Sequence, residues 1–386
     1  MVEGKSMTRR GALLAAVMLA ASGGVAARAD VTPVTTATDA ALPMHVGGRG
    51  ERTAAGYRRQ WPGTYFEAAF RGRDVLVRIG EGDVILRISV DAAPATTLVK
   101  PRPGVYRIGA TTDGDHVVRV DVASESQAAA TVFGGFYAAP GARMLAAAPA
   151  ARRRQIEFIG DSHTVGYGNS ATKRDCSEAE VWATTDTSRA MPALLARHYD
   201  ADYQVNAISG RGVVRNYDGA VGDTVPVAYP FATFDKMTRY ADPAWHPRLF
   251  VIALGTNDFS TALRPGERWA DRTALHADYE RHYVAFVKRL LARDPEAHVL
   301  LWATDLAGGE IAAEVAKVAA RLTADGARNV AFVPVHGLAF DACHAHPSLA
   351  DDARIANVLS AYVEAHPAIW SGNRGGRPPG SHRPQR

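Results

Sequence analysis

The stretch IEFIGDSH, residues 156–163, joins a short apolar run to a glycine, an acid, a serine and a histidine. We interpret the apolar run as a buried strand and the polar residues as the turn that follows it. Open α/β sheets bind ligands beyond the carboxyl ends of their strands, so Ser162 stands where a nucleophile is expected. A serine that only caps the next helix is the alternative interpretation.

The region 155–370 alternates between apolar runs and segments with helical spacing. The expected strands lie at 156–159, 249–254, 299–304 and 330–335, and a further short apolar run lies at 203–205. The expected helices lie at 187–199, 276–292, 311–322 and 355–364. Strands that alternate with helices predict an α/β domain, in which helices flank both faces of a parallel sheet.

The region 40–150 has a different periodicity. Valine, leucine and isoleucine alternate with other residues at 75–79, 84–90 and 118–122, and turns rich in Gly and Asp separate these runs. The pattern predicts an antiparallel β-sandwich domain ahead of the α/β domain. We expect the basic triplet at 152–154 to be a solvated linker between the two domains.

The two ends of the chain differ from its body. Residues 1–29 combine an arginine pair, a short apolar stretch and Ala27-Arg28-Ala29, which predicts an export signal cleaved after Ala29. The expected location is therefore periplasmic or secreted, by a route that stays open. The apolar stretch is too short for a secure membrane span. The tail 371–386, rich in Gly, Pro and Arg, is predicted to be disordered.

Charge and cysteine content exclude several classes of protein. Residues 30–370 carry 36 basic and 39 acidic residues, a net charge of −3, which gives no electrostatic reason to bind nucleic acid. The two cysteines, Cys176 and Cys343, are too few for a disulfide scaffold or an iron–sulfur cluster. An oxidising compartment would allow them to pair, and two separate buried thiols are the alternative.

Three further segments carry candidate chemistry. NAISGRG at 206–212 offers a backbone N–H at Gly210, with Gly212 as the alternative. LGTND at 254–258 offers the side-chain amide of Asn257. DACHAHPS at 341–348 precedes the last expected helix and holds two histidines. Each segment alone is compatible with a turn or a cap, so their joint order along the chain carries the interpretation.

These four segments together resemble the conserved blocks of the SGNH (GDSL-type) hydrolases. With RQWPGT at 59–64 and FRG at 70–72, the whole chain resembles carbohydrate esterase family 2, in which a jelly-roll β-sandwich precedes the SGNH domain. The resemblance implies an esterase that removes O-acetyl groups from polysaccharides such as acetylxylan or glucomannan. It implies no cofactor or metal, and an acetylated polysaccharide or oligosaccharide as the partner.

Ester chemistry gives each matching residue a role. Ser162 Oγ attacks the carbonyl carbon and forms an acyl-enzyme. The N–H groups of Ser162 and Gly210 and the amide of Asn257 are expected to hold the oxyanion. Asp161 and Asp258 are expected to brace their loops rather than transfer protons.

Two histidines compete for the role of base. The spacing Asp341-x-x-His344 is common in SGNH enzymes and would make Asp341 the orienting acid. The continuity of His346 into the last helix favours His346, which lacks an acid three residues earlier. A backbone carbonyl would then orient His346 and give a Ser–His dyad, unless Asp341 reaches the ring through a bent loop. A Cys176–Cys343 disulfide would pin this loop to the segment after Ser162.

Three aromatic residues are candidates for contact with sugar rings: Tyr217, Trp182 and Trp302. Core packing is the alternative for both tryptophans. Ala345 stands where many members of the family have an aromatic residue, so substrate preference transfers less well than the chemistry. An SGNH lipase or thioesterase, or a carbohydrate-binding protein with a decayed site, are the alternative functions.

A metal site is a further alternative. Five side chains near the motifs carry possible metal ligands: Asp161, His163, Asp341, His344 and His346. No helix carries the His-Glu-x-x-His spacing of a zinc hydrolase, so the pattern disfavours this interpretation.

Overall fold

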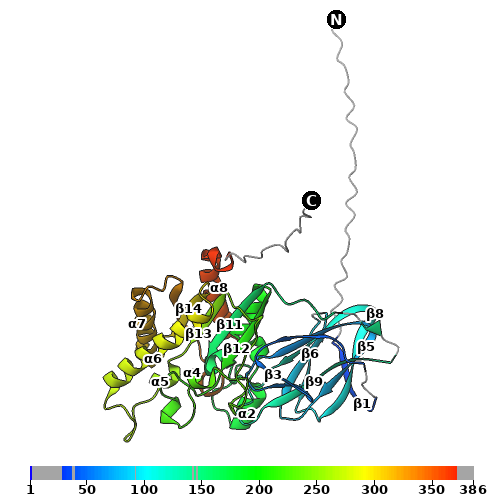
Figure 1. Ribbon diagram of the computed structural model, residues 1–386, viewed down its shortest axis with the longest axis horizontal. Helices are drawn as coiled ribbons and strands as arrows, with labels where there is room; N and C mark the ends of the chain where they lie inside the picture. The colour runs from blue at the N-terminus through cyan, green and yellow to red at the C-terminus, as the bar shows by residue number, and fades with distance from the viewer. Residues whose placement is uncertain (2–27, 37–39, 92, 141–142, 145–146, 372–386) are drawn as a thin grey trace, which may run out of the picture.

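The computed structural model describes residues 1, 28–36, 40–91, 93–140, 143–144 and 147–371. These residues form an antiparallel β domain and an α/β domain that lie side by side, as Figure 1 shows. The predicted fold class is therefore confirmed. Almost all of the expected export signal at 1–29 and of the expected disordered tail at 371–386 falls outside the described residues.

The β domain is built around two long strands. In the described residues it has ten strands: β1 (Asp30–Val34), β2 (Met44–Gly47), β3 (Gly50–Thr53), β4 (Gly56–Arg59), β5 (Tyr65–Ile79), β6 (Ile85–Val90), β7 (Thr96–Val99), β8 (Gly104–Val122), β9 (Thr131–Ala138) and β10 (Arg143–Met144). Strands β5 and β8 pair along almost their full length, with a register shift between Gly72 and Asp74. Alternate residues of both halves of β5 enter one apolar core, which explains the period-two pattern of the sequence.

The α/β domain contains a parallel sheet in the order β12-β11-β13-β14-β15. Its strands are β11 (Arg154–Gly160), β12 (Ala201–Ala207), β13 (Leu249–Ala253), β14 (His298–Thr304) and β15 (Val330–Val335). All five runs expected from the sequence are strands. Because β11, β12 and β13 are neighbours, the three loops that follow them meet at the same edge of the sheet.

Helices cover both faces of this sheet. The described α-helices are α1 (Ser162–Val165), α2 (Glu178–Thr184), α3 (Met191–His198), α4 (Val225–Ala228), α5 (Thr256–Phe259), α6 (Arg272–Arg293), α7 (Glu310–Ala324) and α8 (Leu349–Ala365). Helices α3 and α8 share a core with Phe158 and Val251, whereas α6 and α7 share a core with Ile159 and Ile252. Adjacent strand residues thus point to opposite faces, which is why the strands read as continuous apolar runs.

Two expectations require correction. The helix expected at 187–199 is interrupted, because Ala190 is extended and α3 begins only at Met191, with a proline in its first turn. The basic triplet is not a solvated linker. Arg154 begins β11, and Arg152 forms ion pairs with Glu67 of the β domain at 2.9 Å and Asp202 of β12 at 3.1 Å.

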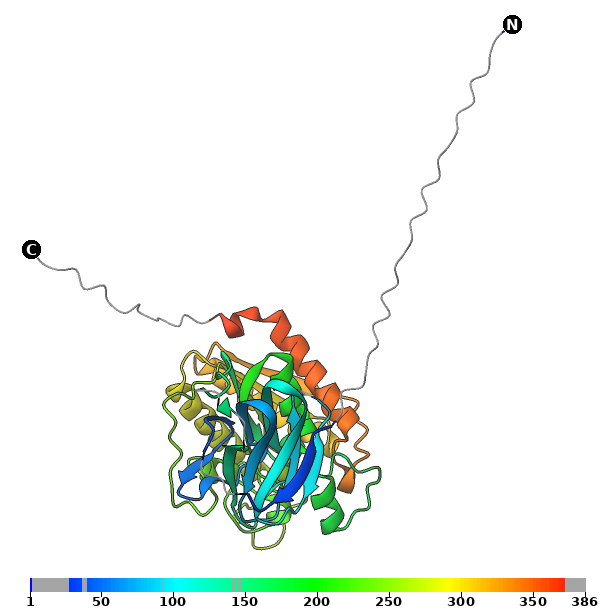
Figure 2. The same ribbon diagram turned by 90° about the vertical axis from the view of Figure 1, so that its right-hand side faces the viewer.

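The β domain packs beside β12, the strand at one edge of the parallel sheet (Figure 1), and lies in front of the α/β domain in the view of Figure 2. The Tyr65 ring lies 4.9 Å from the Tyr203 ring, and its hydroxyl donates to Asp202 at 2.6 Å. Buried Arg49 crosses the interface and pairs with buried Glu157 of β11 at 3.2 Å. These buried contacts attach the β domain to β12 and β11 of the parallel sheet.

Among the helices that the structure describes, none combines the length and the apolar character that a membrane crossing requires.

Candidate active site

Ser162 is the first residue of α1, directly after β11. The side chain of Asp161 caps this short helix by accepting a hydrogen bond from the His163 N–H at 3.1 Å. A Cβ atom at Gly160 would overlap the Thr164 side chain, so glycine is needed for α1 to pack this closely against the end of β11. Ser162 is thereby placed at the carboxyl edge of the sheet, and its N–H, at the start of a helix, has no partner within that helix.

His346 lies against Ser162. Its Nε2 is 2.9 Å from Ser162 Oγ, and its Nδ1 is 3.0 Å from the Cys343 carbonyl and 3.2 Å from the His344 carbonyl. Carbonyl oxygens only accept hydrogen bonds, so the ring proton resides on Nδ1 and Nε2 is left to accept from the serine hydroxyl. The geometry is that of a nucleophile and a base oriented by backbone carbonyls.

Asp341 and His344 are not brought to the serine. His344 Nε2 is 2.7 Å from the Cys176 carbonyl, and its Nδ1 is 3.0 Å from the Tyr167 hydroxyl. Asp341 is exposed and pairs with Arg174 at 3.0 Å. Both side chains thus hold the histidine-bearing loop against the segment after Ser162, and the Asp341–His344 register is not assembled at the nucleophile.

The segment Phe340–Ser348, which we call the histidine loop, is anchored by further contacts. Cys343 is joined to Cys176 by a disulfide, with Cα atoms 5.4 Å apart. The Tyr167 ring lies 4.3 Å from the His346 ring. The Leu349 N–H donates to the Asn169 carbonyl at 3.0 Å, at the point where the loop enters α8. These contacts attach His346 to the same segment that begins with Ser162.

The candidate oxyanion donors Gly210 and Asn257 lie after the two strands that flank β11. Gly210 follows β12 at φ +79°, and among the described residues no acceptor contacts its N–H. Asn257 lies in α5, after β13, and its amide donates one hydrogen to the Arg211 carbonyl at 2.9 Å. That bond fixes the amide and leaves its second hydrogen available for a ligand.

The N–H of Gly212, the alternative to Gly210, already has a hydrogen-bond partner within its own loop. Its N–H donates to Asn216 Oδ1 at 3.3 Å, and an added Cβ would overlap the Arg215 carbonyl. Asp258 accepts three backbone N–H groups of the same loop, at 2.9 to 3.0 Å, from Val213, Val214 and Arg215. Gly212 and Asp258 therefore shape the loop that presents Gly210.

Two residues of the β domain hold the same loop and were missed by sequence reasoning. Glu125 accepts the Ser209 N–H at 2.9 Å, and Gln127 donates to the Ser209 carbonyl at 3.1 Å. Gln127 also donates to Glu125 at 3.1 Å. The peptide groups that flank Ser209, directly before Gly210, are thus clamped from the other domain. No local motif marks these residues, because the contact joins positions about 84 residues apart.

Burial sets the protonation states around the serine. It lowers the pKa of His346 to about 4 and that of His163, whose ring lies 5.6 Å away, to about 3. Burial also raises the pKa of Asp161 to about 7 and that of Asp258 to about 6. At neutral pH His346 is neutral, and a neutral imidazole is the form that accepts a proton from serine.

The three candidate sugar-binding aromatics lie in different environments. Trp302 is 1% exposed in the core beneath the sheet, so the prediction that it contacts sugar is wrong: β14 has neighbours on both sides and helices on both faces. Tyr217 is 53% exposed, and its N–H donates to the Gly210 carbonyl at 2.9 Å. Trp182 is half-buried on α2, with the Lys100 ammonium 4.7 Å from its ring centroid.

Within the described ranges, no three His, Cys, Asp or Glu side chains converge into a group that would hold a metal ion. Asp161, His163, Asp341, His344 and His346, considered together from the sequence, are engaged separately in the contacts given above.

A serine at the carboxyl edge of a parallel sheet, a neutral imidazole at hydrogen-bond distance and N–H donors on the flanking loops are the parts that acyl transfer requires. The fold and the site thus define a carboxylic ester hydrolase of the SGNH class.

Comparison with known proteins places both domains. Residues 46–149 match the family model for the N-terminal domain of carbohydrate esterase 2, and residues 158–367 match the GDSL-like lipase/acylhydrolase family. The chain is 41% identical over 335 residues to an acetylxylan esterase / glucomannan deacetylase of Cellvibrio japonicus, covering 85% of this chain and 92% of that protein. It is also 31% identical to the cellulase/esterase CelE of Acetivibrio thermocellus, over 64% of this chain and 30% of that protein.

Solved structures of carbohydrate esterases have the same fold as this chain. One carbohydrate esterase, described as showing divergent catalytic and non-catalytic binding functions at its active site, superposes with a TM-score of 0.80 at 41% identity, covering 86% of this chain and 99% of that chain. A family two carbohydrate esterase from Clostridium thermocellum in complex with cellohexaose has a TM-score of 0.74 at 25% identity, covering 84% of this chain and 99% of that chain. The chain belongs to carbohydrate esterase family 2.

Proposed function

We propose that this carbohydrate esterase removes O-acetyl groups from polysaccharides of the acetylxylan or glucomannan type, with Ser162 and His346 as a catalytic dyad. The contact of 2.9 Å between Ser162 Oγ and His346 Nε2 carries the proposal. The names of the relatives support the substrate class, because the Cellvibrio japonicus protein is described as an acetylxylan esterase / glucomannan deacetylase.

In the first half of the reaction, Ser162 Oγ attacks the acetyl carbonyl carbon and transfers its proton to His346 Nε2. The carbonyl oxygen becomes an oxyanion held by the N–H groups of Ser162 and Gly210 and the amide of Asn257. When the tetrahedral intermediate collapses, the bond between the carbonyl carbon and the sugar oxygen breaks. The sugar oxygen takes the proton from Nε2, and the acetyl group stays on Ser162.

In the second half, water attacks the acetyl-serine and gives a proton to the same Nε2. Collapse of the second intermediate releases acetic acid and returns a proton to Ser162 Oγ. The carbonyls of Cys343 and His344 keep the Nδ1 proton in place and stabilise the imidazolium in both halves. A carboxylate is not required for this cycle, because two carbonyl dipoles take its orienting role.

We further propose that the protein is exported. The arginine pair, the apolar stretch and Ala27-Arg28-Ala29 support an export signal at residues 1–29. The Cys176–Cys343 disulfide also supports export, because such a bond persists in an oxidising compartment. The substrate, an insoluble or high-molecular-weight polysaccharide, would be met outside the cytoplasm.

The test is the release of acetate from acetylated xylan and acetylated glucomannan, with the Ser162→Ala protein as the inactive control. We expect the wild type to release acetate and to prefer p-nitrophenyl acetate over p-nitrophenyl palmitate. A preference for the long acyl chain would favour the lipase or thioesterase alternative. Binding of xylan without any release of acetate would favour the binding protein and overturn the proposal.

A further inference from the structure

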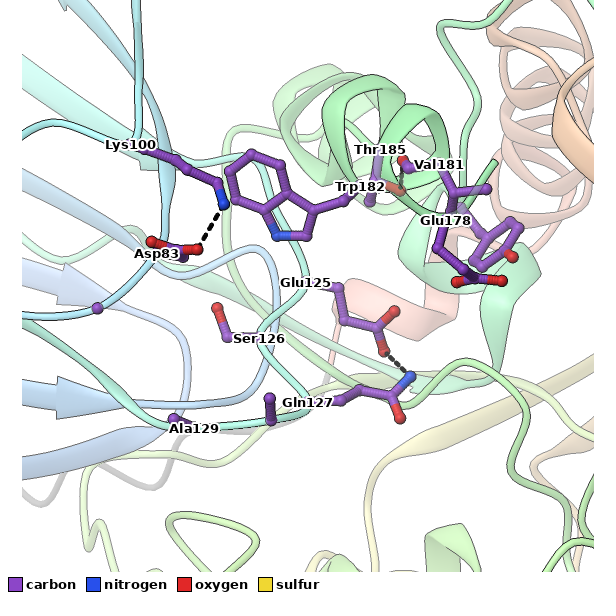
Figure 3. Close-up of a pocket in the computed structure, with 13 residues that line it drawn as sticks. Asp83, Lys100, Glu125, Ser126, Gln127, Ala129, Glu178, Val181, Trp182 and Thr185 are labelled. Carbon is purple, nitrogen blue, oxygen red and sulfur yellow. Dashed lines mark hydrogen bonds and ion pairs between the residues drawn. The ribbon is translucent and has the colours of Figure 1, made fainter. Parts of the chain in front are cut away.

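A pocket of about 620 Å³ lies between the two domains, and residues of both domains line it (Figure 3). The β domain contributes Asp83, Lys100 and Gln127, and the α/β domain contributes Tyr167, Glu178 and Trp182. Figure 3 shows Trp182 extending from α2 toward Lys100, with Glu125 and Gln127 across the pocket. The volume falls in the range of small-molecule sites, which is roughly 300–1,000 Å³.

The pocket adjoins the catalytic residues through two of its lining side chains. Tyr167 lines the pocket, and its ring lies 4.3 Å from the ring of His346. Glu125 lines it as well and holds the N–H of Ser209, the residue before Gly210. A ligand in the pocket would therefore be a neighbour of the group that reacts at Ser162.

The lining side chains suit an uncharged sugar. The Trp182 indole offers an apolar surface for the C–H face of a pyranose ring, while carboxylates and the Gln127 amide can bond its hydroxyls. Lys100 is neutralised by Asp83 at 2.6 Å, which leaves the carboxylate of Glu178 without a matching cation in the pocket. This excess of negative charge disfavours a sugar that carries a carboxylate.

We propose that this pocket is a subsite for an uncharged sugar unit that neighbours the acetylated unit in the same chain. The inference rests on the proposed function and extends it, because it makes the β domain part of the substrate-binding surface. It implies that the enzyme gains rate from oligosaccharide length and loses rate when the flanking unit is a uronic acid.

The first test compares kcat/KM for an acetylated xylohexaose with kcat/KM for p-nitrophenyl acetate. Trp182→Ala should lower the ratio of kcat/KM for the xylohexaose to kcat/KM for p-nitrophenyl acetate by about tenfold, the order expected for loss of one aromatic contact. Trp182→Phe should restore most of this ratio. Trp370→Ala is the matched control, because Trp370 is also half-buried and lies beyond the far end of α8 from the histidine loop. Equal ratios for Trp182→Ala and Trp370→Ala would overturn the proposal.

The second test measures binding without catalysis, so it separates failure of the subsite from failure of the esterase proposal. The Ser162→Ala protein is titrated with unacetylated xylohexaose, with a hexaose that bears a uronic acid, and with xylose. We expect the neutral hexaose to bind at least tenfold more tightly than the other two ligands. Glu178→Gln should reduce the difference in affinity between the neutral hexaose and the hexaose with the uronic acid. Equal affinity for xylose and the neutral hexaose would overturn the proposal even if acetate release is confirmed.

Discussion

The two halves of the site are positioned by different means. Ser162, Gly210 and Asn257 each follow one of three adjacent parallel strands, so the hydrogen bonds of the sheet set their spacing. The histidine loop begins five residues beyond β15 and is held by side-chain contacts and a disulfide. The positions of Ser162, Gly210 and Asn257 are therefore set by the fold, whereas the position of His346 depends on a few individual contacts.

The backbone of the histidine loop also differs from that of the strand ends. Phe340, His344 and Ala345 adopt positive φ angles of 53°, 52° and 57°. Such a conformation is costly for residues other than glycine, and it persists only where surrounding contacts impose it. Loss of those contacts should therefore release the loop, whereas removal of the Asn257 side chain should leave the fold intact.

Among the variants of the oxyanion donors and of the loop contacts, the largest effect is expected for Asn257→Ala. It removes one oxyanion donor and should lower kcat about 10²–10³-fold, with little change in KM. Kinetics on p-nitrophenyl acetate, together with the thermal unfolding midpoint, provide the measurement. A variant that loses activity only in proportion to a lower midpoint would show that Asn257 acts through stability alone.

The next effect concerns the anchor of the loop. The double variant Cys176→Ala, Cys343→Ala should lower the free energy of unfolding by about 2–5 kcal/mol, because the disulfide closes a loop over 167 positions. On heating this variant, activity should also be lost at a lower temperature than that at which most of the secondary structure unfolds. Denaturant unfolding and residual activity after heating measure the two quantities. If reductant changes neither the free energy of unfolding nor the residual activity of the wild type, the disulfide does not hold the histidine loop.

A smaller effect is expected where the β domain contacts the donor half. Glu125→Ala removes the acceptor of the Ser209 N–H and should lower kcat on p-nitrophenyl acetate about tenfold at nearly constant KM. Glu125→Gln keeps an oxygen acceptor and should restore most of the rate. A purely structural role for Glu125 would instead lower the unfolding midpoint without changing kcat per titrated active site.

The smallest effect at neutral pH concerns the protonation of the base. Burial lowers the pKa of His346 to about 4, so kcat/KM of the free enzyme should stay level down to about pH 5 and fall to half near pH 4. An acid limb near 6.5, the ordinary pKa of histidine, would contradict the burial of the ring in the working enzyme.

Stability sets the control for that profile. The folded-state pKa values of His346 and His163 lie below 6.5, so the unfolded chain binds protons first as the pH falls. Their contribution to stability is thus complete above pH 6.5 and is lost as the pH falls to about 4 for His346 and to about 3 for His163. Recovery of activity when briefly acidified enzyme is returned to pH 7 would show that protonation of His346, and not unfolding, causes the loss of rate.

The strand-end residues of the site were predictable from the sequence, whereas the geometry of the histidine loop was not. Ser162, Gly210 and Asn257 were found because each follows an apolar run that reads as a strand, and strand ends of a parallel sheet meet at one edge. The choice of His346 over His344 depended on resemblance, since loop geometry has no periodic signal. The sequence does not show that Trp302 faces the core, because a buried strand and an exposed edge both tolerate tryptophan.

Contacts between the domains were beyond sequence reasoning. Arg152 reads as part of a charged linker, yet it joins Glu67 and Asp202 across the interface. Glu125 and Gln127 read as ordinary polar residues near a turn, yet they hold the loop of Gly210. Such pairs form only when two separately predictable domains dock, so neither local propensity nor residue spacing predicts them.

The most direct test of the account is kcat/KM on p-nitrophenyl acetate for His346→Ala, His344→Ala and Asp341→Asn, measured beside Ser162→Ala. A base oriented by the carbonyls of Cys343 and His344 predicts that His346→Ala falls about as far as Ser162→Ala, by several powers of ten. It predicts that Asp341→Asn stays near the wild type and that His344→Ala loses far less than His346→Ala. Inactive His344→Ala and Asp341→Asn proteins beside an active His346→Ala protein would contradict it.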